Sequence, residues 1–442
     1  MAIPTANTTV SSTVFVPPPI QRVEETGLSP LWLQDLALKI LYFQGYLTGF
    51  RVAEEIALPF SGVVDLILES LKREKLVEIR QSQVGGLGEG AYQYAITGAG
   101  IARAREALER SQYAGPAPVS LEIYNESVRR QSRSRSLVTP RLMRQVMNHL
   151  ILSENTFHKL GPAVNSGTSI FIYGPPGNGK TSVARAIGTL ILNQPIYIPY
   201  SVFVGGQVIT LYDSVNHQVI PEDDTKLPGT GGIRTGVKRD PRWVRIRRPF
   251  IMTGGELTLA GLDLVFDDVH RFYEAPFQMK ANGGILLIDD FGRQQVRPRD
   301  LLNRWIVPLE NRIDYLSLHT GRKIELVFDV LVVFSTNLPP KELVDEAFLR
   351  RLRHKIEIPD PSPEEFREIF RRVTSQKGIP YDDQGLAYLI QEWYIKRNRK
   401  LRANHPRDLC EQVLDISHYL AVEPGMTRDL IDRAAEAYFV EL

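Results

Sequence analysis

Residues 169–192 read SIFIYGPPGNGKTSVARAIGTLIL, which joins an apolar run, a loop rich in glycine and proline, and an amphipathic pattern. The apolar run predicts a buried strand, and the pattern after the loop predicts a helix. A strand, a glycine-rich loop ending in Gly-Lys-Thr and a helix, in that order, are typical of a phosphate-binding loop. The alternative is a glycine-rich loop with an accidental Gly-Lys-Thr, which the order of the elements disfavours.

Each residue type in this loop suits a nucleoside triphosphate with Mg²⁺. Glycines let backbone N–H groups turn inward around phosphates, and the start of the following helix favours an anion. Lys180 supplies a positive charge for the outer phosphates, and Thr181 offers its hydroxyl to Mg²⁺. We therefore expect ATP to be bound by Gly174, Pro175, Pro176, Gly177, Asn178, Gly179, Lys180, Thr181 and Ser182.

A second apolar run, Gly284 to Ile288, leads directly into Asp289 and Asp290. A parallel strand would place both carboxylates at its carboxyl end, where open parallel sheets bind ligands. We expect Asp289, with Thr181, to hold Mg²⁺, and Asp290 to orient or activate the attacking water. The alternative is a strand that ends in a solvated acidic turn.

Five motifs in order, PPGNGKT, LLIDD, LVVFSTN, DEAFLRRLRHKIEIP and HPRDL, resemble those of the AAA+ ATPases. The resemblance extends from about Leu137 to Leu442. It implies an ATP-hydrolysing core built on a twisted parallel sheet, followed by a helical lid. Up to about Pro359, strand-like runs alternate with helical patterns, which independently predicts an α/β fold with helices on both faces of a parallel sheet.

The resemblance assigns roles to further polar residues. In that family an Asn after the strand next to the acidic pair polarises the water, which corresponds to Asn337. A lid arginine contacts the γ-phosphate, which corresponds to Arg407. Arginines before the last core strand reach into the neighbouring subunit's site, which corresponds to Arg350 or Arg351, with Arg353 the weaker match. Any of these last three could instead be a solvated charge or a partner of a nearby acid.

An arginine supplied by a neighbouring subunit implies a homo-oligomer. Such a group neutralises charge that develops on the γ-phosphoryl group, and it does so only after assembly. Members of the family commonly form rings of six subunits, and nothing in the composition fixes that number.

The middle region is similar to bacterial AAA+ proteins labelled only as ATPases with chaperone activity. The wording that carries this similarity includes DPRWVRIRRPFIMTGGELTLAGLDL and LLNRWIVPLENRIDY. One departure concerns the acidic pair, which is commonly Asp-Glu in the family and is Asp289-Asp290 here. The Asp290 side chain is one methylene shorter, so its carboxylate stands further from the attacking water. Two consequences are open: slow hydrolysis, or a backbone shift that compensates for the shorter side chain.

Changes in composition divide the chain into expected segments. They are a Thr/Ser/Pro-rich tail (1–30), a winged-helix-like domain (31–112), a basic linker (113–149), the nucleotide-binding core (150–359) with an insertion around 205–250, and a helical lid (360–442). The second segment resembles winged helix-turn-helix modules because helical patterns precede a glycine-rich turn, a strand-like AYQYAIT and another helical pattern. Ser362, Pro363 and Glu365 predict the start of the first lid helix.

Several features bear on a nucleic-acid partner. Residues 31–110 hold nine Lys and Arg against ten Asp and Glu, a poor surface for phosphates that favours a protein partner. Residues 234–248 hold seven Lys and Arg around Asp240 and Trp243, which would suit either nucleic acid, with Trp243 stacking on a base, or an acidic subunit interface. The same alternatives apply to Lys396, Arg397, Arg399, Lys400 and Arg402.

A further motif in the insertion, Phe203-Val204-Gly205, resembles the aromatic pore loop with which AAA+ unfoldases grip polypeptide. A core strand that ends in a glycine turn is the favoured alternative.

Composition restricts the compartment. The chain has 442 residues, 53 Lys and Arg against 51 Asp and Glu, and the single cysteine Cys410, which excludes an internal disulfide and a globally basic protein. The opening residues 1–21 contain no Lys or Arg, and the uncharged stretch 186–212 is broken by proline and glycine. We expect a cytoplasmic protein without a secretory signal or a membrane span.

The leading hypothesis is an ATP-driven remodeller, a ring-forming ATPase that acts on an unidentified protein partner. The alternatives are a DNA-associated ATPase that uses the winged helix and the arginine runs, and a nucleotide switch that hydrolyses little. Measured turnover separates the switch from the other two, and salt-dependent binding to duplex DNA tests the second.

Overall fold

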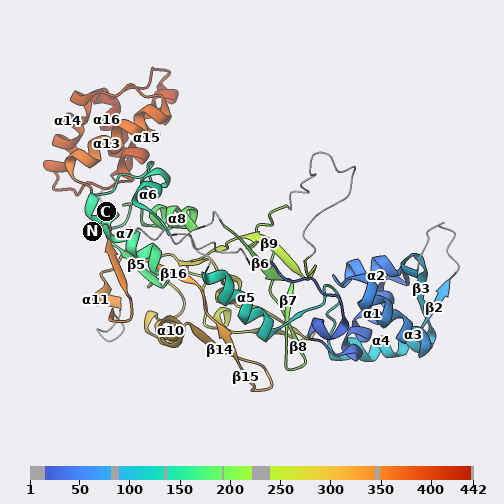
Figure 1. Ribbon diagram of the computed structural model, residues 1–442. Helices are drawn as coiled ribbons and strands as arrows, with labels where there is room; N and C mark the ends of the chain where they lie inside the picture. Colours follow the sequence, from blue (N-terminus) through green and yellow to red (C-terminus); the bar gives the residue numbers. More distant parts are fainter. Residues whose placement is uncertain are drawn as a thin grey trace, which may run out of the picture.

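The computed structural model describes residues 15–80, 89–133, 137–191, 194–221, 239–343 and 349–439. Its centre is a five-stranded sheet in the order β10-β13-β16-β5-β17, in which every neighbouring pair is parallel. The strands are β5 (Ser169–Tyr173), β10 (Phe250–Thr253), β13 (Ile285–Ile288), β16 (Leu331–Thr336) and β17 (His354–Glu357). Helices pack on both faces, which confirms the predicted α/β fold class (Figure 1).

Side chains of the central strands are buried on both faces of the sheet. Ile170 and Ile172 of β5 pack in one core with α6 (Pro140–Val146), α7 (Glu154–Ser166) and α8 (Lys180–Ile191). Phe171 packs on the other face with α10 (Pro298–Asn311). A parallel sheet between two helical layers needs apolar residues on both faces, which explains the unbroken apolar runs in the sequence.

The N-terminal helices and strands have their own core. A 3-10 turn η1 (Val23–Thr26) is followed by α1 (Pro30–Gln44), β1 (Tyr46–Thr48), α2 (Gly49–Glu55), a π-helical turn η2 (Phe60–Val64), α3 (Asp65–Arg73), β2 (Val77–Arg80), η3 (Glu89–Ala91), β3 (Gln93–Ile96) and α4 (Gly98–Arg110). The strands form an antiparallel sheet in the order β1-β3-β2. Much of the predicted glycine-rich turn, residues 81–88, lies outside the described residues.

A β-rich region, which we name the β subdomain, lies between the N-terminal helices and the parallel sheet (Figure 1). One of its sheets has the order β11-β12-β8-β7-β4, and the pairs β6-β9 and β14-β15 accompany it. The strands are β4 (Val119–Ser120), β6 (Pro195–Pro199), β7 (Ser201–Val204), β8 (Gln207–Thr210), β9 (Trp243–Arg247), β11 (Val265–Asp267), β12 (Phe272–Glu274), β14 (Ile313–Ser317) and β15 (Lys323–Val327), with the short helices η4 (Ala260–Leu262) and α9 (Phe277–Lys280). Of the insertion expected around 205–250, the described residues 205–221 and 239–249 thus lie in a unit assembled from distant parts of the sequence.

The segment expected to be a linker contains helix α5 (Leu121–Arg133) and, after it, α6. Tyr124 of α5 is buried, and the Asn125 amide group bonds the backbone of Glu325 and Val327. Arg129 and Arg130 of α5 are exposed on the opposite side of this helix. Their charges favoured the interpretation of the segment as a solvated linker. The helix forms because its apolar face has a partner in β15, which the local sequence does not reveal.

Phe203 does not form an exposed pore loop. It lies in β7, and its ring packs edge-on against Trp32 of α1 at a centroid distance of 5.3 Å. Gly205 and Gly206 have positive φ values of 58° and 82° and turn the chain into β8. This is the core strand with a glycine turn that the sequence favoured.

The C-terminal residues form a helical bundle of α13 (Pro363–Lys377), α14 (Asp383–Leu389), the π-helical η5 (Ile390–Ile395), α15 (His405–Leu420) and α16 (Arg428–Tyr438) around one apolar core. The predicted start of α13 is confirmed, because Ser362 Oγ accepts from Glu365 N–H while the Glu365 carboxylate accepts from Ser362 N–H. Cys410 is buried in this core, and burial raises its pKa to about 12, which suits a packing role. Among the described helices, none has the length and apolar character needed to cross a membrane.

Candidate functional site

The loop between β5 and α8 is shaped by its glycines. Gly177 and Gly179 both have φ of 81°, a left-handed conformation that side chains disfavour. A Cβ on Gly174 would stand 2.2 Å from the carbonyl oxygen of Ile358, so only glycine allows the loop to lie against the strand-end of β17. The loop thereby reverses the chain over the carboxyl end of the sheet and begins α8 at Lys180.

Lys180 is buried, and its ammonium group bonds to the chain itself. Nζ donates to the carbonyl oxygens of Gly174 at 3.0 Å and Pro175 at 2.8 Å, and to Asn337 Oδ1 at 2.6 Å. Burial lowers the pKa of Lys180, and the charges of Asp290 and Asp289 oppose that effect. The structure therefore brings together Lys180 and Asn337, which are 157 residues apart in the sequence.

The two acidic residues after β13 stand beside the start of α8. Thr181 Oγ1 donates to Asp289 Oδ2 at 2.9 Å, and Asn337 Nδ2 donates to Asp290 Oδ1 at 3.4 Å. Asp290 has φ of 49°, a left-handed conformation that Asp and Asn adopt more readily than Glu does. The backbone conformation at position 290 therefore favours Asp over Glu, which is the common residue here in the family that the sequence resembles.

Gln294 supports this acidic turn and was not anticipated from the sequence. Its Nε2 donates to the carbonyl oxygens of Asp289 and Asp290 at 3.0 and 3.2 Å, and its Oε1 accepts from Gly292 N–H at 2.8 Å. Gln294 is buried, so its amide group fixes the turn from within. The only sequence signal is its position four residues after Asp290, which is too weak to single it out.

A cavity of about 520 Å³ adjoins the loop. Its walls come from residues 148–152, from the loop and α8, and from the C-terminal bundle, including Arg372 and Arg407. Arg407 is 63% exposed and pairs with the neighbouring Asp408 at 2.9 Å. The structure therefore brings Arg407 to the rim of the cavity, where it faces the same space as Gly177 and Ser182.

Arg350 and Arg351 lie elsewhere on the sheet. They precede the amino end of β17, whereas Lys180 and Asp289 lie at the carboxyl ends of strands that run parallel to it. Arg351 Nε bonds Glu310 at the end of α10 at 2.6 Å, and Arg350 is exposed. The two ends of a parallel strand face opposite ways, so these arginines are not grouped with the acidic pair of their own chain.

The basic run of residues 234–248 is largely a structural feature where it is described. Arg242, Trp243 and Arg248 are all 2% exposed or less, while Arg234 and Lys238 lie outside the described residues. Trp243 Nε1 donates to Asp240 at 3.2 Å, so the interpretation of Trp243 as a base-stacking residue is wrong.

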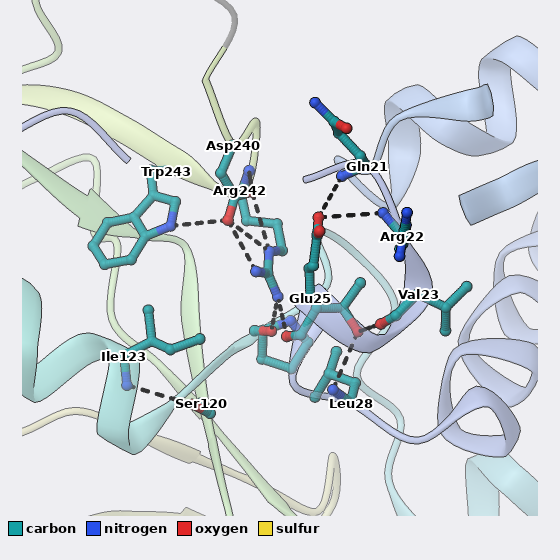
Figure 2. A network of polar contacts seen from close by, with 12 residues as sticks. Gln21, Arg22, Val23, Glu25, Leu28, Ser120, Ile123, Asp240, Arg242 and Trp243 are labelled. Carbon is teal, nitrogen blue, oxygen red and sulfur yellow. Dashed lines mark hydrogen bonds and ion pairs between the residues drawn. The ribbon is translucent and has the colours of Figure 1, made fainter. Parts of the chain in front are cut away.

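Arg242 is the centre of this network, which Figure 2 shows in close view. Its guanidinium forms a bidentate pair with Asp240 and also donates to the carbonyl oxygens of Thr26 at 2.7 Å and Pro118 at 2.9 Å. One buried arginine thus joins η1, the segment before β4 and the segment before β9. Its hydrogen-bonding capacity is used inside the chain rather than presented to a ligand.

A family model described as "Domain of unknown function (DUF8689)" matches residues 362–437, the C-terminal bundle. No curated protein matches this sequence.

Solved structures with a similar fold include RuvB of Thermotoga maritima, described as a Holliday junction branch migration motor, at 15% identity and a TM-score of 0.36 over 65% of this chain and 70% of that chain. NtrX from Brucella abortus is similar at 15% identity and a TM-score of 0.40 over 78% of this chain and 68% of that chain. A second NtrX structure, in complex with ADP, has 15% identity and a TM-score of 0.38 over 75% of this chain and 65% of that chain. These similarities concern the arrangement of strands and helices.

Proposed function

We propose that this chain is an AAA+ ATPase that binds and hydrolyses ATP with Mg²⁺ and works as a ring-type homo-oligomer on a protein partner. One observation carries the proposal. Lys180, the acidic pair and Asn337 follow three adjacent parallel strands, β5, β13 and β16, and meet at the loop whose residues Gly177 to Gly179 line a cavity of about 520 Å³. A lysine, an acidic pair and an amide grouped at the carboxyl end of a parallel sheet suit phosphoryl transfer.

The residues present fit a bound nucleotide and Mg²⁺. The left-handed glycines Gly177 and Gly179 open the loop for backbone N–H groups to face an anion, and the first turn of α8 adds its positive end. Thr181 Oγ1 and Asp289 Oδ2 offer hard oxygen donors 2.9 Å apart, which is the donor type that Mg²⁺ prefers. When bound, Mg²⁺ supplies positive charge to the phosphate oxygens.

The chain's own residues divide the work of hydrolysis. Lys180 exchanges its bonds to the loop carbonyls for bonds to phosphate, and its burial strengthens that attraction. Asp290 orients the attacking water and accepts its proton, and Asn337, which contacts both Lys180 and Asp290, positions the same water. Arg407 from the lid, which lines the cavity, contacts the γ-phosphate, and Arg351 or Arg350 acts on the site of a neighbouring subunit.

A protein partner at the N-terminal domain is supported by its surface. We treat residues 31–112 as a winged-helix-like domain, residues 360–442 as the lid, and the parallel sheet between them as the ATPase core. Exposed aromatic side chains are Phe43, Tyr46, Phe50 and Tyr92, at 60%, 52%, 56% and 45% exposure. Exposed aromatic groups on a domain without excess positive charge suit contact with protein rather than with a phosphate backbone.

A DNA-associated ATPase is the less favoured alternative. It needs the arginine runs to face solvent. In the first run Arg242 and Arg248 are buried and bonded to the chain, whereas Arg247 and, in the lid run, Lys396, Arg397 and Lys400 are exposed. Duplex DNA binding that weakens steeply with salt would favour it, and no binding at low salt would exclude it.

A slow nucleotide switch is a second candidate, and the left-handed Asp290 favours it. A shorter acid held in this conformation suits stable ATP binding with little turnover. Steady-state hydrolysis separates a switch from a motor.

The proposed function is tested by ATP hydrolysis across a protein concentration series, measured beside size-exclusion light scattering. We expect specific activity to rise with assembly. Arg351→Ala or Arg350→Ala should still bind ATP and lose about a thousandfold of the assembled rate, because a trans-acting arginine stabilises the transition-state charge. Arg433→Ala, an exposed arginine of α16 that pairs with Asp429, is the matched control. A protein that stays monomeric and turns over no ATP at high concentration would exclude the motor.

A further inference from the structure

The connection between the parallel sheet and the C-terminal bundle is a short segment, Ile358 to Pro361, between β17 and α13. Pro359 and Pro361 restrict their own backbone angles, and each also restricts the residue before it. Asp360 stands between them and is half-buried. Its carboxylate is therefore held in place by a stiff connector between the sheet and the bundle.

Asp360 contacts both the phosphate-binding loop and the bundle. Its Oδ1 accepts a hydrogen bond from Asn178 Nδ2 at 2.8 Å, and the same oxygen accepts from Arg402 Nη1. Asn178 also accepts from Ala403 N–H at 3.1 Å and donates to the carbonyl oxygen of Pro359 at 3.0 Å. The buried Asn178 side chain of the loop thus contacts both the connector and the bundle.

Asn404 of the bundle packs against the phosphate-binding loop. A Cβ placed on Gly177 would stand 2.1 Å from Asn404 Oδ1, so the bundle lies in direct contact with the phosphate-binding loop. Asn404 Nδ2 is itself held by Asp408 at 2.8 Å and Tyr438 at 3.1 Å. The segment 402–404 is therefore fixed against the loop from the bundle side.

Arg402 is placed differently from Arg407. Its side chain is 23% exposed and shares the Asp360 carboxylate with Asn178 of the phosphate-binding loop. Arg407 is 63% exposed and bonded to its own neighbour, Asp408. Of the two arginines, Arg402 is the one that is bonded to a partner of the loop itself.

We propose that Arg402 is a second lid cation for the outer phosphates of ATP, stored on Asp360 while the loop holds no phosphate. This inference rests on the proposed function. A guanidinium pairs bidentately with carboxylate or phosphate, so a triphosphate at the loop competes with Asp360 for Arg402. Release of Arg402 from Asp360 removes one of the bonds between the bundle and its connector. The competition couples the presence of the γ-phosphate to the contact between the lid and the connector.

The proposal makes two substitutions act in opposite directions. Arg402→Gln removes the cation and should weaken binding of a non-hydrolysable ATP analogue about tenfold, with a smaller effect on ADP. Asp360→Asn keeps the shape and the bond from Asn178 but loosens its hold on Arg402, so it should strengthen binding of the analogue about threefold. In the double variant the gain from Asp360→Asn should disappear, because the cation it frees is absent.

The measurement is isothermal titration of the analogue and of ADP, at fixed Mg²⁺, into the full-length chain and each variant. Arg433→Gln is the matched control, since Arg433 is an exposed lid arginine paired with Asp429. Arg402→Lys keeps a charge and should restore part of the affinity. The ratio of analogue to ADP affinity is the decisive readout, because a merely destabilised lid would lower both together.

The outcomes separate this inference from the proposed function. If the unmodified chain binds the analogue but Asp360→Asn weakens it, or Arg402→Gln leaves the ratio unchanged, the storage of Arg402 is wrong and the ATPase proposal stands. If the unmodified chain binds neither nucleotide, both are wrong.

Discussion

Lys180 and Arg242 are both buried cations, yet their surroundings differ. Arg242 is 1% exposed and its guanidinium is fully engaged by one carboxylate and two carbonyl oxygens of distant segments. Lys180 donates to two carbonyl oxygens of its own loop and to Asn337 Oδ1, and that loop lines a cavity of about 520 Å³. Burial of a cation is therefore no guide to function by itself. The two differ in whether the cation is enclosed within the chain, as Arg242 is, or belongs to a loop that lines a cavity, as Lys180 does.

The largest expected effect concerns the cation beside the cavity. Lys180→Ala should weaken ATP binding at least about a hundredfold, because it removes the charge aimed at the outer phosphates. Fluorescence titration with a labelled ATP analogue measures the loss. Lys159→Ala, an exposed lysine of α7, is the control and should bind as the unmodified chain does. Retained affinity in Lys180→Ala would show that the buried cation beside the cavity does not bind nucleotide.

Asp290→Asn should separate binding from turnover. Asn tolerates the left-handed φ of 49° at this position, so the acidic turn should keep its shape. Loss of the carboxylate should lower steady-state hydrolysis by a factor of about 100 to 10,000 while nucleotide affinity stays unchanged. Asp268→Asn, an exposed acid in the turn between β11 and β12, should leave both unchanged. Equal turnover in the two variants would remove Asp290 from the mechanism.

Arg242→Ala tests the structural side of the comparison. It leaves the Asp240 carboxylate buried without its cation, which should lower the free energy of unfolding by about 3–5 kcal/mol. Urea denaturation measures this loss, and Arg247→Ala at the end of β9, where the side chain is exposed, should cost about 0.5 kcal/mol or less. Adding Asp240→Asn to Arg242→Ala should recover part of the stability, because the orphaned charge is removed. A defect in nucleotide binding with no loss of stability would contradict the structural role of Arg242.

The smallest effect is a pH dependence in the lid. Burial, aided by the charge of Arg402, lowers the pKa of His405 from 6.5 to about 4. As the pH falls below 6.5, the unfolded chain takes up a proton that the folded bundle refuses, so stability decreases until about pH 4 and no further. With solvent screening the loss should be about 1–2 kcal/mol.

Thermal unfolding between pH 7 and pH 4 checks this expectation. His405→Gln should flatten the decrease, whereas His418→Gln, an exposed position on the same helix, should leave it unchanged. A decrease of equal size in both variants would assign the pH dependence to other groups.

Individual residues show how much of the structure the sequence predicts. The strand, loop and helix around Lys180, the acidic pair after β13 and the start of α13 are all local patterns, and the structure has these elements where the sequence predicts them. Gln294 and Asp360 escaped notice because a lone Gln or an Asp between prolines carries no local signal. Trp243 misled for the same reason, because a tryptophan among arginines looks like a binding surface until its burial is known.

The sequence by itself determined the α/β fold class and the chemical groups available to a phosphate-binding loop, because backbone propensity and apolar periodicity act over a few neighbouring residues. Only the tertiary structure decided which cations are used up inside the chain and which stand beside a cavity. Arg242 meets Thr26, and Arg402 meets Asp360, across 216 and 42 residues respectively. Burial and pairing of charge depend on which distant segments pack together, and no local pattern encodes that choice.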